Sequence, residues 1–333
     1  MASESLTLLL SRQAAQSYGA RIDEAMGATR YRYLFPDEEP DMDGTWAADI
    51  ALLSRDVTAD SGKTVLAPSL ERFYDMLRRS PNLRWLQLHQ AGADRPICAE
   101  MRARGVAVTT ASGANAVPVA QMAIAGMLAL TRRIPELLDA QRRRAWEPLL
   151  GARAPRDLQG QTAVVVGLGP IGLEIARLLK ALRVKVIGVR RSATPSPDVD
   201  QAVPLGDLHS VLPKADFLFL ACPLTDETRG LLRTETIDLL PPSAHVINVS
   251  RGDVIVERDL IAALRNGRIG GAYLDVFVDE PLHAQSALWD FSNVIVTPHT
   301  AGHTTGHYAA VGEIFADNLK CWLRGLPLRN AIA

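Results

Sequence analysis

Cysteine is scarce in this sequence and is nowhere clustered. The only three cysteines in 333 residues are Cys98, Cys222 and Cys321, and no CxxC pair or histidine-rich group accompanies them. A disulfide framework or a structural zinc site needs cysteines that are paired or closely spaced. We therefore expect neither of these and no bound metal. The pattern is typical of a reducing compartment and predicts a cytoplasmic location.

A surplus of charge of one sign and a long apolar run are also missing. The 36 basic and 37 acidic residues leave a net charge of -1, which gives no electrostatic basis for binding nucleic acid or a membrane surface. The apolar stretch Val117–Leu130 contains Gln121 and Gly126 and is shorter than the ~18 residues of a membrane span. The start, Met1–Leu10, includes Glu4 and does not resemble a secretory signal. We expect no nucleic-acid or membrane partner.

Alternating strand and helix patterns run through the chain, and the length and the 47% hydrophobic content suffice for two cores. Such alternation predicts parallel sheets covered by helices on both faces. A break of small residues at Ser112–Asn115 precedes a long helix pattern over Val117–Arg133 and separates two series of strands. The first series is predicted at Leu6–Leu10, Asp49–Ser54, Leu83–Leu88 and Gly105–Thr109.

The second series of strands is enough for a complete doubly wound sheet of five or six strands. The segment Ser192–Pro204, which has three prolines, is predicted to be a surface loop. The final helix, predicted over His307–Arg324, has no strand beside it and should pack on the first domain. The strands of this series are predicted at Thr162–Val166, Lys185–Val189, Phe217–Ala221, His245–Val249, Gly271–Leu274 and Asn293–Thr297.

A GxGxxG string connects the strand at Thr162–Val166 to a helix predicted over Leu173–Leu182. Strand, glycines and helix in this order form the fingerprint of a dinucleotide-binding turn. Gly167 permits the tight turn, Gly169 lets the backbone approach a pyrophosphate, and Gly172 allows close packing of helix on strand. The amides at the start of the helix would hold the phosphates. Pro170 suits the first helical position, where a missing N–H costs little.

Two arginines stand where a dinucleotide site usually has an acidic residue for the adenosine ribose. Arg190 lies 23 residues after Gly167 and is followed by Arg191. A guanidinium cannot accept a hydrogen bond from a ribose hydroxyl, but it pairs well with a 2′-phosphate. The sequence therefore favours NADP over NAD. The alternative is that both arginines only face solvent.

Chemically capable side chains follow three strands of the second series. Arg251 comes after the strand at His245–Val249, Asp275 and Glu280 after the next, and His299 after the last. Since ligands of open α/β sheets bind beyond the carboxyl ends of the strands, an arginine, an acid and a histidine can meet there. Taken alone, each of these residues is as easily explained as a surface or structural residue as by a catalytic role. Their occurrence as an ordered set favours a catalytic site.

Over nearly its whole length the sequence resembles the D-isomer-specific 2-hydroxyacid dehydrogenases. The resemblance is carried by the glycine fingerprint, Pro223-Leu224-Thr225, Ser250-Arg251-Gly252, Asp275 to Leu282 and Pro298-His299. It implies an α/β fold in which a Rossmann cofactor domain, residues 113–301, is inserted into a flavodoxin-like substrate domain, residues 1–112 and 302–333. It also implies a homodimer formed largely through the cofactor domain, which would bury the helix at Val117–Leu130.

The resemblance also implies roles that agree with the chemistry of the side chains. Arg251 would bind the substrate carboxylate through its planar donor fork. His299 would carry the proton in both directions, and Glu280 would orient it and favour its charged form. Further cofactor contacts implied by the resemblance are Ile171, Ser192, Cys222, Pro223, Thr228, Val249 and, at the nicotinamide end, Asp275. Cys222 is expected to be a small apolar neighbour of the cofactor and not a nucleophile.

In the first domain the resemblance points to a loop that grips the substrate carboxylate through backbone amides. Ala91 and Gly92 would be its contacts, although an ordinary turn is the alternative reading of this segment. Trp146 either reaches the active site of a partner subunit, as an aromatic residue does in some relatives, or serves packing.

Reduction of a small 2-oxo acid, with glyoxylate or hydroxypyruvate favoured, is the activity that these features predict. A long phosphoglycerate dehydrogenase is disfavoured because no regulatory domain follows Ala333, and a formate dehydrogenase because it pairs its histidine with glutamine. A different class of protein, a dinucleotide-sensing corepressor on the same fold, remains the alternative. The absence of a basic segment speaks against it.

Overall fold

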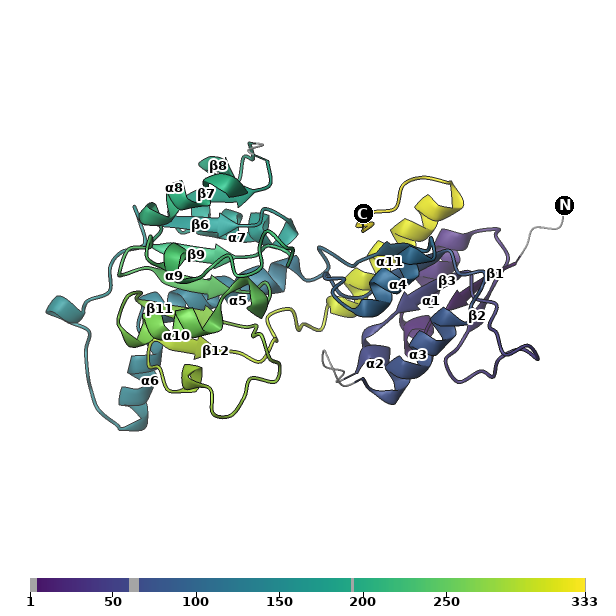
Figure 1. Cartoon of the computed structure of the whole chain (residues 1–333), viewed down its shortest axis with the longest axis horizontal. Coiled ribbons are helices and arrows are strands. Elements are labelled where there is room, and N and C mark those ends of the chain that lie inside the picture. The colour runs from purple at the N-terminus through teal and green to yellow at the C-terminus, as the bar shows by residue number, and fades with distance from the viewer. Residues whose placement is uncertain (1–4, 60–65, 193–194, 333) are drawn as a thin grey trace. The chain divides into compact units, whose positions relative to one another are not determined.

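The computed structural model describes residues 5–59, 66–192 and 195–332. The first residues of Met1–Leu10 and part of Ser192–Pro204 fall outside these ranges. The chain forms two compact units, Met1–Asn115 with Thr304–Ala333, and Ala116–His303 (Figure 1). Among the described residues, no helix has the length and apolar character needed to cross a membrane.

Five parallel strands form the sheet of the first unit, in the order β2-β1-β3-β4-β5 that defines flavodoxin-like sheets. They are β1 (Leu6–Leu9), β2 (Tyr31–Leu34), β3 (Ile50–Leu53), β4 (Trp85–Leu88) and β5 (Ala107–Thr109). The sequence predicted four of them and missed β2. This edge strand pairs only with β1, and Arg32 is exposed, so its sequence lacks the apolar run of a buried strand.

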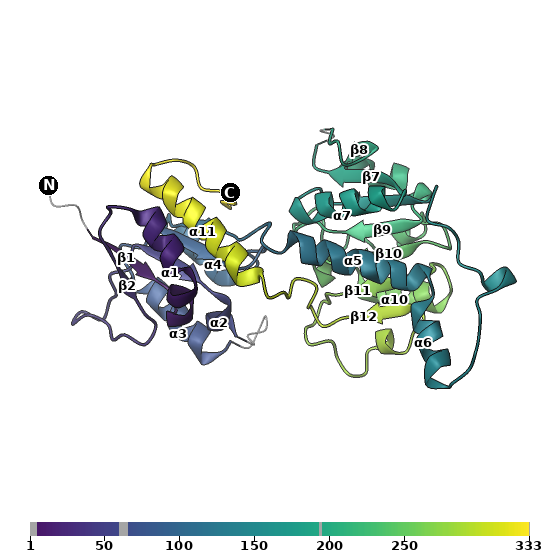
Figure 2. The same cartoon turned by 180° about the vertical axis from the view of Figure 1, so that it is seen from behind.

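Helices cover both faces of this sheet. Alternating side chains of a strand point to opposite faces: Leu8 packs in the cluster with α1 and α11, while Leu9 packs in the cluster with α2, α3 and α4. The prediction that the final helix returns to the first domain is confirmed, since α11 lies against α1 (Figure 2). The helices are α1 (Arg12–Met26), α2 (Arg55–Thr58), α3 (Pro68–Arg78), α4 (Pro96–Ala103) and α11 (His307–Leu323).

Seven parallel strands form the sheet of the second unit, in the order β12-β11-β10-β9-β6-β7-β8. The central strands have the Rossmann order, with β6 and β9 at the switch point. They are β6 (Thr162–Val166), β7 (Lys185–Arg190), β8 (Gln201–Pro204), β9 (Phe217–Leu220), β10 (His245–Asn248), β11 (Gly271–Leu274) and β12 (Val294–Val296).

The prediction of a surface loop over Ser192–Pro204 is wrong at its end, because β8 forms there and brings the sheet to seven strands. β8 is an edge strand that pairs only with β7, and Pro204 is its last residue. A proline is tolerated at such an edge, where its missing N–H removes no hydrogen bond of a central ladder.

Each face of the second sheet has its own helical layer. Successive residues of each strand point to opposite faces of the sheet. One alternating set packs with α5 and α7, and the other set packs with α8, α9 and α10. Figure 2 shows α5 and α7 in front of this sheet, and Figure 1 shows α9 and α10 on the opposite side. These helices, with α6 beyond α5, are α5 (Ala116–Thr131), α6 (Ile134–Arg142), α7 (Pro170–Ala181), α8 (Leu208–Val211), α9 (Thr234–Ile237) and α10 (Glu257–Arg265).

The apolar helix α5 is already covered within its own unit. Val119, Ala123 and Met127 are buried in the cluster with α7 and the sheet, while Val117 is 49% exposed. The face of α5 that carries these buried residues therefore needs no partner subunit to cover it, and burial of the opposite face in a dimer stays a prediction. The homodimer itself remains a prediction.

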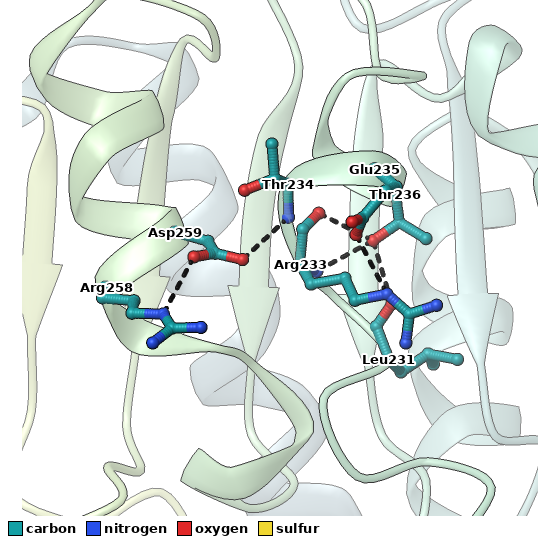
Figure 3. A network of polar contacts seen from close by, with 7 residues as sticks. All are labelled: Leu231, Arg233, Thr234, Glu235, Thr236, Arg258 and Asp259. Atoms are coloured by element: carbon teal, nitrogen blue, oxygen red, sulfur yellow. Dashed lines mark hydrogen bonds and ion pairs between the residues drawn. The ribbon is translucent and has the colours of Figure 1, made fainter.

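Polar contacts fix α9 to the beginning of α10 (Figure 3). Asp259 of α10 accepts a hydrogen bond from the amide of Thr234 at 3.0 Å. Thr236 accepts one from the amide of Arg233 at 2.8 Å and donates to the carbonyl of Leu231 at 2.9 Å. Two of the otherwise unpaired amides at the start of this short helix are thereby satisfied, and α10 is fixed to α9.

Candidate active site

The glycine loop after β6 has the backbone that a phosphate-binding turn requires. Gly167 has a φ of +96°, a value that favours glycine, and its amide donates to Val189 of β7 at 2.8 Å. Gly169 is the N-cap of α7, and Pro170 is its first residue, the position predicted to suit a proline, so the helix begins three residues before the predicted Leu173. A Cβ at Gly169 would meet no atom within 4 Å. Open space at the start of a twelve-residue helix fits a pyrophosphate group.

Two close approaches explain why the loop needs its other glycines. A Cβ at Gly172 would lie 1.8 Å from the carbonyl oxygen of Gly167, so α7 could not pack on β6 with any side chain there. A Cβ at Gly167 would lie 2.6 Å from the backbone of Cys222, which follows β9 across the switch point.

The surroundings of Cys222 agree with the expectation that it is no nucleophile. Burial raises the pKa of its thiol to about 11, so the reactive thiolate is scarce at neutral pH. A protonated thiol suits a small apolar neighbour of the cofactor.

Arg190 is the last residue of β7, and Arg191 follows it on the surface. The amide of Gly167 donates a hydrogen bond to the carbonyl of Val189. Arg190, the next residue after Val189, therefore lies close to the glycine loop at the carboxyl edge of the sheet. Ser192 is exposed beside Arg191. This is where the adenosine end of a dinucleotide lies in a Rossmann sheet.

The loop that carries Arg251 is tied down by Asn248, the fully buried last residue of β10. Asn248 accepts hydrogen bonds from the amide and hydroxyl of Ser250, at 3.0 and 2.7 Å, and its Nδ2 donates to the carbonyl of Arg251 at 3.0 Å. One guanidinium nitrogen of Arg251 donates to the carbonyl of Ser250 at 2.7 Å. The backbone of this loop is thus fixed, and one arm of the predicted donor fork is already engaged.

Gly252 brings the Arg251 loop into direct contact with the segment that leads to Glu280. A Cβ at Gly252 would lie 1.9 Å from the carbonyl carbon of Phe277 and 2.2 Å from the amide nitrogen of Val278. Any side chain here would push the two loops apart. The glycine of the Ser250-Arg251-Gly252 motif therefore sets the spacing between them.

Glu280 and His299 form the predicted pair. His299 Nδ1 lies 2.8 Å from Glu280 Oε2, and Glu280 Oε1 accepts from the amide of Phe277 at 3.0 Å. The imidazole is 50% exposed and the carboxylate behind it 22% exposed. With Nδ1 held by the carboxylate, Nε2 is the nitrogen left to exchange a proton with a ligand.

His299 sits in a backbone conformation that few residues other than glycine adopt, with a φ of +47°. Its amide donates to the carbonyls of Asp275 and Thr297, at 2.8 and 3.0 Å. The buried carboxylate of Asp275 accepts from the amides of Thr300 and Ala301. Backbone strain of this kind is concentrated at functional sites and persists only where surrounding contacts hold it.

The remaining predicted contacts are in varied surroundings. Thr228 is buried, and its hydroxyl makes hydrogen bonds within its own turn. It donates to the carbonyl of Pro223 at 2.7 Å and accepts from the amide of Thr225 at 2.8 Å. Ala91 and Gly92 lie in the first unit, in the segment after β4, and His89 and Gln90 separate them from the strand. Trp146 is 96% exposed, so it does not pack within this chain. Ile171 is partly buried in α7, and Val249 is buried beside the end of β10.

Two residues with a part in this geometry were not singled out from the sequence. Asn248 orders the Arg251 loop, and Thr297 donates to the carboxylate of Asp275 at 2.6 Å. A polar residue at the end of an otherwise apolar strand was the available signal for Asn248.

The structure brings three of the predicted residues to one edge of a sheet. Arg251, Asp275 and His299 follow β10, β11 and β12, in that order. Because these strands are neighbours in one sheet, the three residues share its carboxyl edge.

Known proteins resemble this chain in sequence. Residues 124–301 match the family model described as "D-isomer specific 2-hydroxyacid dehydrogenase, NAD binding domain". A glyoxylate reductase of Thermofilum pendens is 34% identical over 260 residues, which are 75% of each chain. A D-3-phosphoglycerate dehydrogenase of Synechocystis sp. is 36% identical over 69% of this chain but 41% of its own, so the chain spans less than half the length of that relative.

A solved structure resembles the whole chain. The D-isomer specific 2-hydroxyacid dehydrogenase of Xanthobacter autotrophicus Py2, determined in complex with NADPH and MES, is 28% identical. The two structures superpose with a TM-score of 0.76, and the match covers 99% of this chain and 98% of the other.

Proposed function

Because the chain belongs to the D-isomer-specific 2-hydroxyacid dehydrogenase family, we propose that it interconverts a small 2-oxo acid and the corresponding 2-hydroxy acid with a nicotinamide dinucleotide. The observation that carries the proposal is the 2.8 Å contact between His299 and Glu280, at the same sheet edge as the glycine loop. A half-exposed imidazole backed by a carboxylate is the arrangement of an acid–base group.

The chain's own residues handle the substrate and the proton. Arg251 binds the carboxylate of the substrate and polarises the neighbouring carbonyl. When bound, the cofactor supplies the hydride that reaches the carbonyl carbon. His299 gives a proton to the carbonyl oxygen as it becomes an alkoxide, and in the reverse direction takes the proton from the hydroxyl. Ala91 and Gly92 complete the grip on the carboxylate through their backbone amides.

The favoured cofactor is NADP, with Arg190 and Arg191 pairing with the 2′-phosphate and Asp275 facing the nicotinamide end. Support comes from the place of Arg190 beside the glycine loop and from the NADPH in the related Xanthobacter structure. Arg190→Asp should weaken NADPH and help NADH, because a carboxylate repels the phosphate and accepts from the ribose. Ratios of kcat/KM for the two cofactors test this; a ratio equal to that of the unaltered protein would contradict the pairing.

Glyoxylate and hydroxypyruvate are the proposed substrates, in line with the name of the Thermofilum relative. The test is oxidation of NADPH and NADH, followed at 340 nm, against a panel of 2-oxo acids that includes glyoxylate, hydroxypyruvate, pyruvate and 3-phosphohydroxypyruvate. Turnover restricted to the phosphorylated acid would move the assignment to phosphoglycerate oxidation. No turnover with any of them would favour a dinucleotide-sensing protein on the same fold.

We also place the protein in the cytoplasm as a homodimer. Exposed apolar residues on α6 and in the segment that follows it support a partner: Ile134, Leu138, Trp146 and Leu150 are 40%, 44%, 96% and 70% exposed. Sedimentation velocity at micromolar concentration decides the oligomeric state, with a monomer as the contrary result.

A further inference from the structure

Tyr273, Thr297 and Asp275 form a chain of hydrogen bonds with a defined direction. Thr297 Oγ1 lies 2.6 Å from Asp275 Oδ1 and 2.9 Å from the hydroxyl of Tyr273. An ionised carboxylate only accepts, so the single hydroxyl proton of Thr297 points to Asp275. Tyr273 must then donate its own proton to Thr297. Burial raises the pKa of Tyr273 to about 12, so this proton stays in place at neutral pH.

The chain ends on the loop that carries His299. The side chain of Asp275 is 2% exposed, and its carboxylate accepts from the amides of Thr300 at 2.9 Å and Ala301 at 3.1 Å. A buried carboxylate is stable only where donors converge on it. The hydroxyl of Thr297 is the shortest of these contacts, and such charge-assisted bonds are the strong ones.

The backbone of His299 needs this support because its φ of +47° is costly for a residue with a side chain. Its own amide and the two amides that follow are all held by Asp275, through the carbonyl and the carboxylate. If the carboxylate turned away, the loop would lose the contacts on the C-terminal side of the histidine.

The far end of the chain is anchored in the core. The ring of Tyr273 is buried, and a Cβ at Gly126 of α5 would lie 2.3 Å from it. The helix therefore leaves room for the ring only because residue 126 is glycine. Tyr273 cannot turn without displacing α5, so its hydroxyl is a fixed donor.

We infer that Thr297 and Tyr273 are positioning residues for proton transfer by His299, which they hold in place through the carboxylate of Asp275. The inference rests on the proposed function, because it assigns the residues that make His299 effective. They touch neither substrate nor reacting atoms and act only through the geometry of the loop.

Thr297→Val tests this with a side chain of the same shape and no hydroxyl. We expect kcat for glyoxylate to fall by about tenfold, since small misplacements of a reacting group are costly, while the Kd for NADPH in a fluorescence titration is nearly unchanged. Thr297→Ser restores the hydroxyl and should recover most of the rate. Unimpaired turnover by the valine variant, or equal loss in both variants, would overturn the inference.

Hydrogen exchange gives a readout that does not need activity. In a peptide that spans residues 297–303, exchange should be faster in Thr297→Val and, more mildly, in Tyr273→Phe than in the unaltered protein and in Thr297→Ser. If the unaltered protein reduces no 2-oxo acid, the proposed function fails while this comparison still decides the positioning role. Equal exchange in all four proteins overturns the positioning role alone.

Discussion

His299 and His89 follow parallel strands at the carboxyl edges of the two sheets, yet they are suited to opposite tasks. The imidazole of His299 is half-exposed and backed by Glu280. His89 directly follows β4, its Nε2 lies 3.1 Å from the hydroxyl of Thr58, and its Nδ1 is buried without a hydrogen-bond partner among the described residues. Exposure and the charge of the partner, more than the place in the fold, decide which imidazole can exchange protons.

The protonation of His89 follows from its surroundings. Thr58 gives its hydroxyl proton to the carbonyl of Arg55 at 2.8 Å, so His89 Nε2 must be the donor to Thr58. Burial first, then the charges of His307, Arg55 and Arg95, lowers the pKa of His89 to about 3. His89 is therefore a neutral structural residue throughout the physiological pH range.

The largest effect should come from removing the proposed proton carrier, His299. His299→Gln should lower kcat for reduction by roughly 10²-fold or more, the usual scale for a general acid, and leave NADPH binding largely intact. His209→Gln, the same substitution at an exposed position of α8, is the matched control. Steady-state kinetics with glyoxylate test this prediction. A near-normal kcat in His299→Gln would show that His299 is not the proton carrier and would remove the proposed difference in function between His299 and His89.

A second variant separates grip on the substrate from proton transfer. Arg251→Lys keeps the charge and loses the planar fork, so KM for glyoxylate should rise about tenfold. Any added fall in kcat reports lost polarisation of the carbonyl. The Kd for NADPH should stay nearly constant, because the glycine loop lies after a different strand. A collapse of NADPH affinity with an unchanged KM would place Arg251 in the cofactor site.

The buried histidine should reveal itself through acid sensitivity. Unfolded His89 takes a proton near pH 6.5 but the folded one only near pH 3, so its contribution to stability is present above pH 6.5 and is lost as the pH falls below it. At pH 5 the loss is about 2 kcal/mol. The stability difference between pH 7 and pH 5, measured by urea unfolding, should be smaller by this amount in His89→Gln; equal differences would refute the buried neutral state.

The smallest effect is expected at Glu280, the partner of the His299 imidazole. Glu280→Gln keeps a hydrogen bond to His299 and removes the negative charge that favours its charged form. The pH optimum for reduction should move downward, with a milder loss of kcat than in His299→Gln. The kcat/KM profile between pH 5 and 9 measures this shift. An unchanged profile would count against the pair.

Local sequence patterns predicted most of the fold, and the failures have a common cause. Buried strands such as β6 and β11 were predicted at the observed bounds because both of their faces are apolar. The edge strands β2 and β8 were missed because they carry polar residues or proline, whereas β5 and β12, which also lie at sheet edges, are mainly apolar and were predicted. The burial of α5 depends on Tyr273 and on helix α7, which no pattern within the helix itself can reveal.

The candidate site divides in the same way. The sequence by itself determined the glycine loop, the order of Arg251, Glu280 and His299, and the strands that they follow, because these are properties of contiguous segments. Only the tertiary structure decided that Glu280 meets His299, that Gly252 sets the distance between two loops, and that Tyr273 and Thr297 reach the histidine through Asp275. Such contacts join residues from different strands, and their distances depend on how the whole sheet and its helices pack.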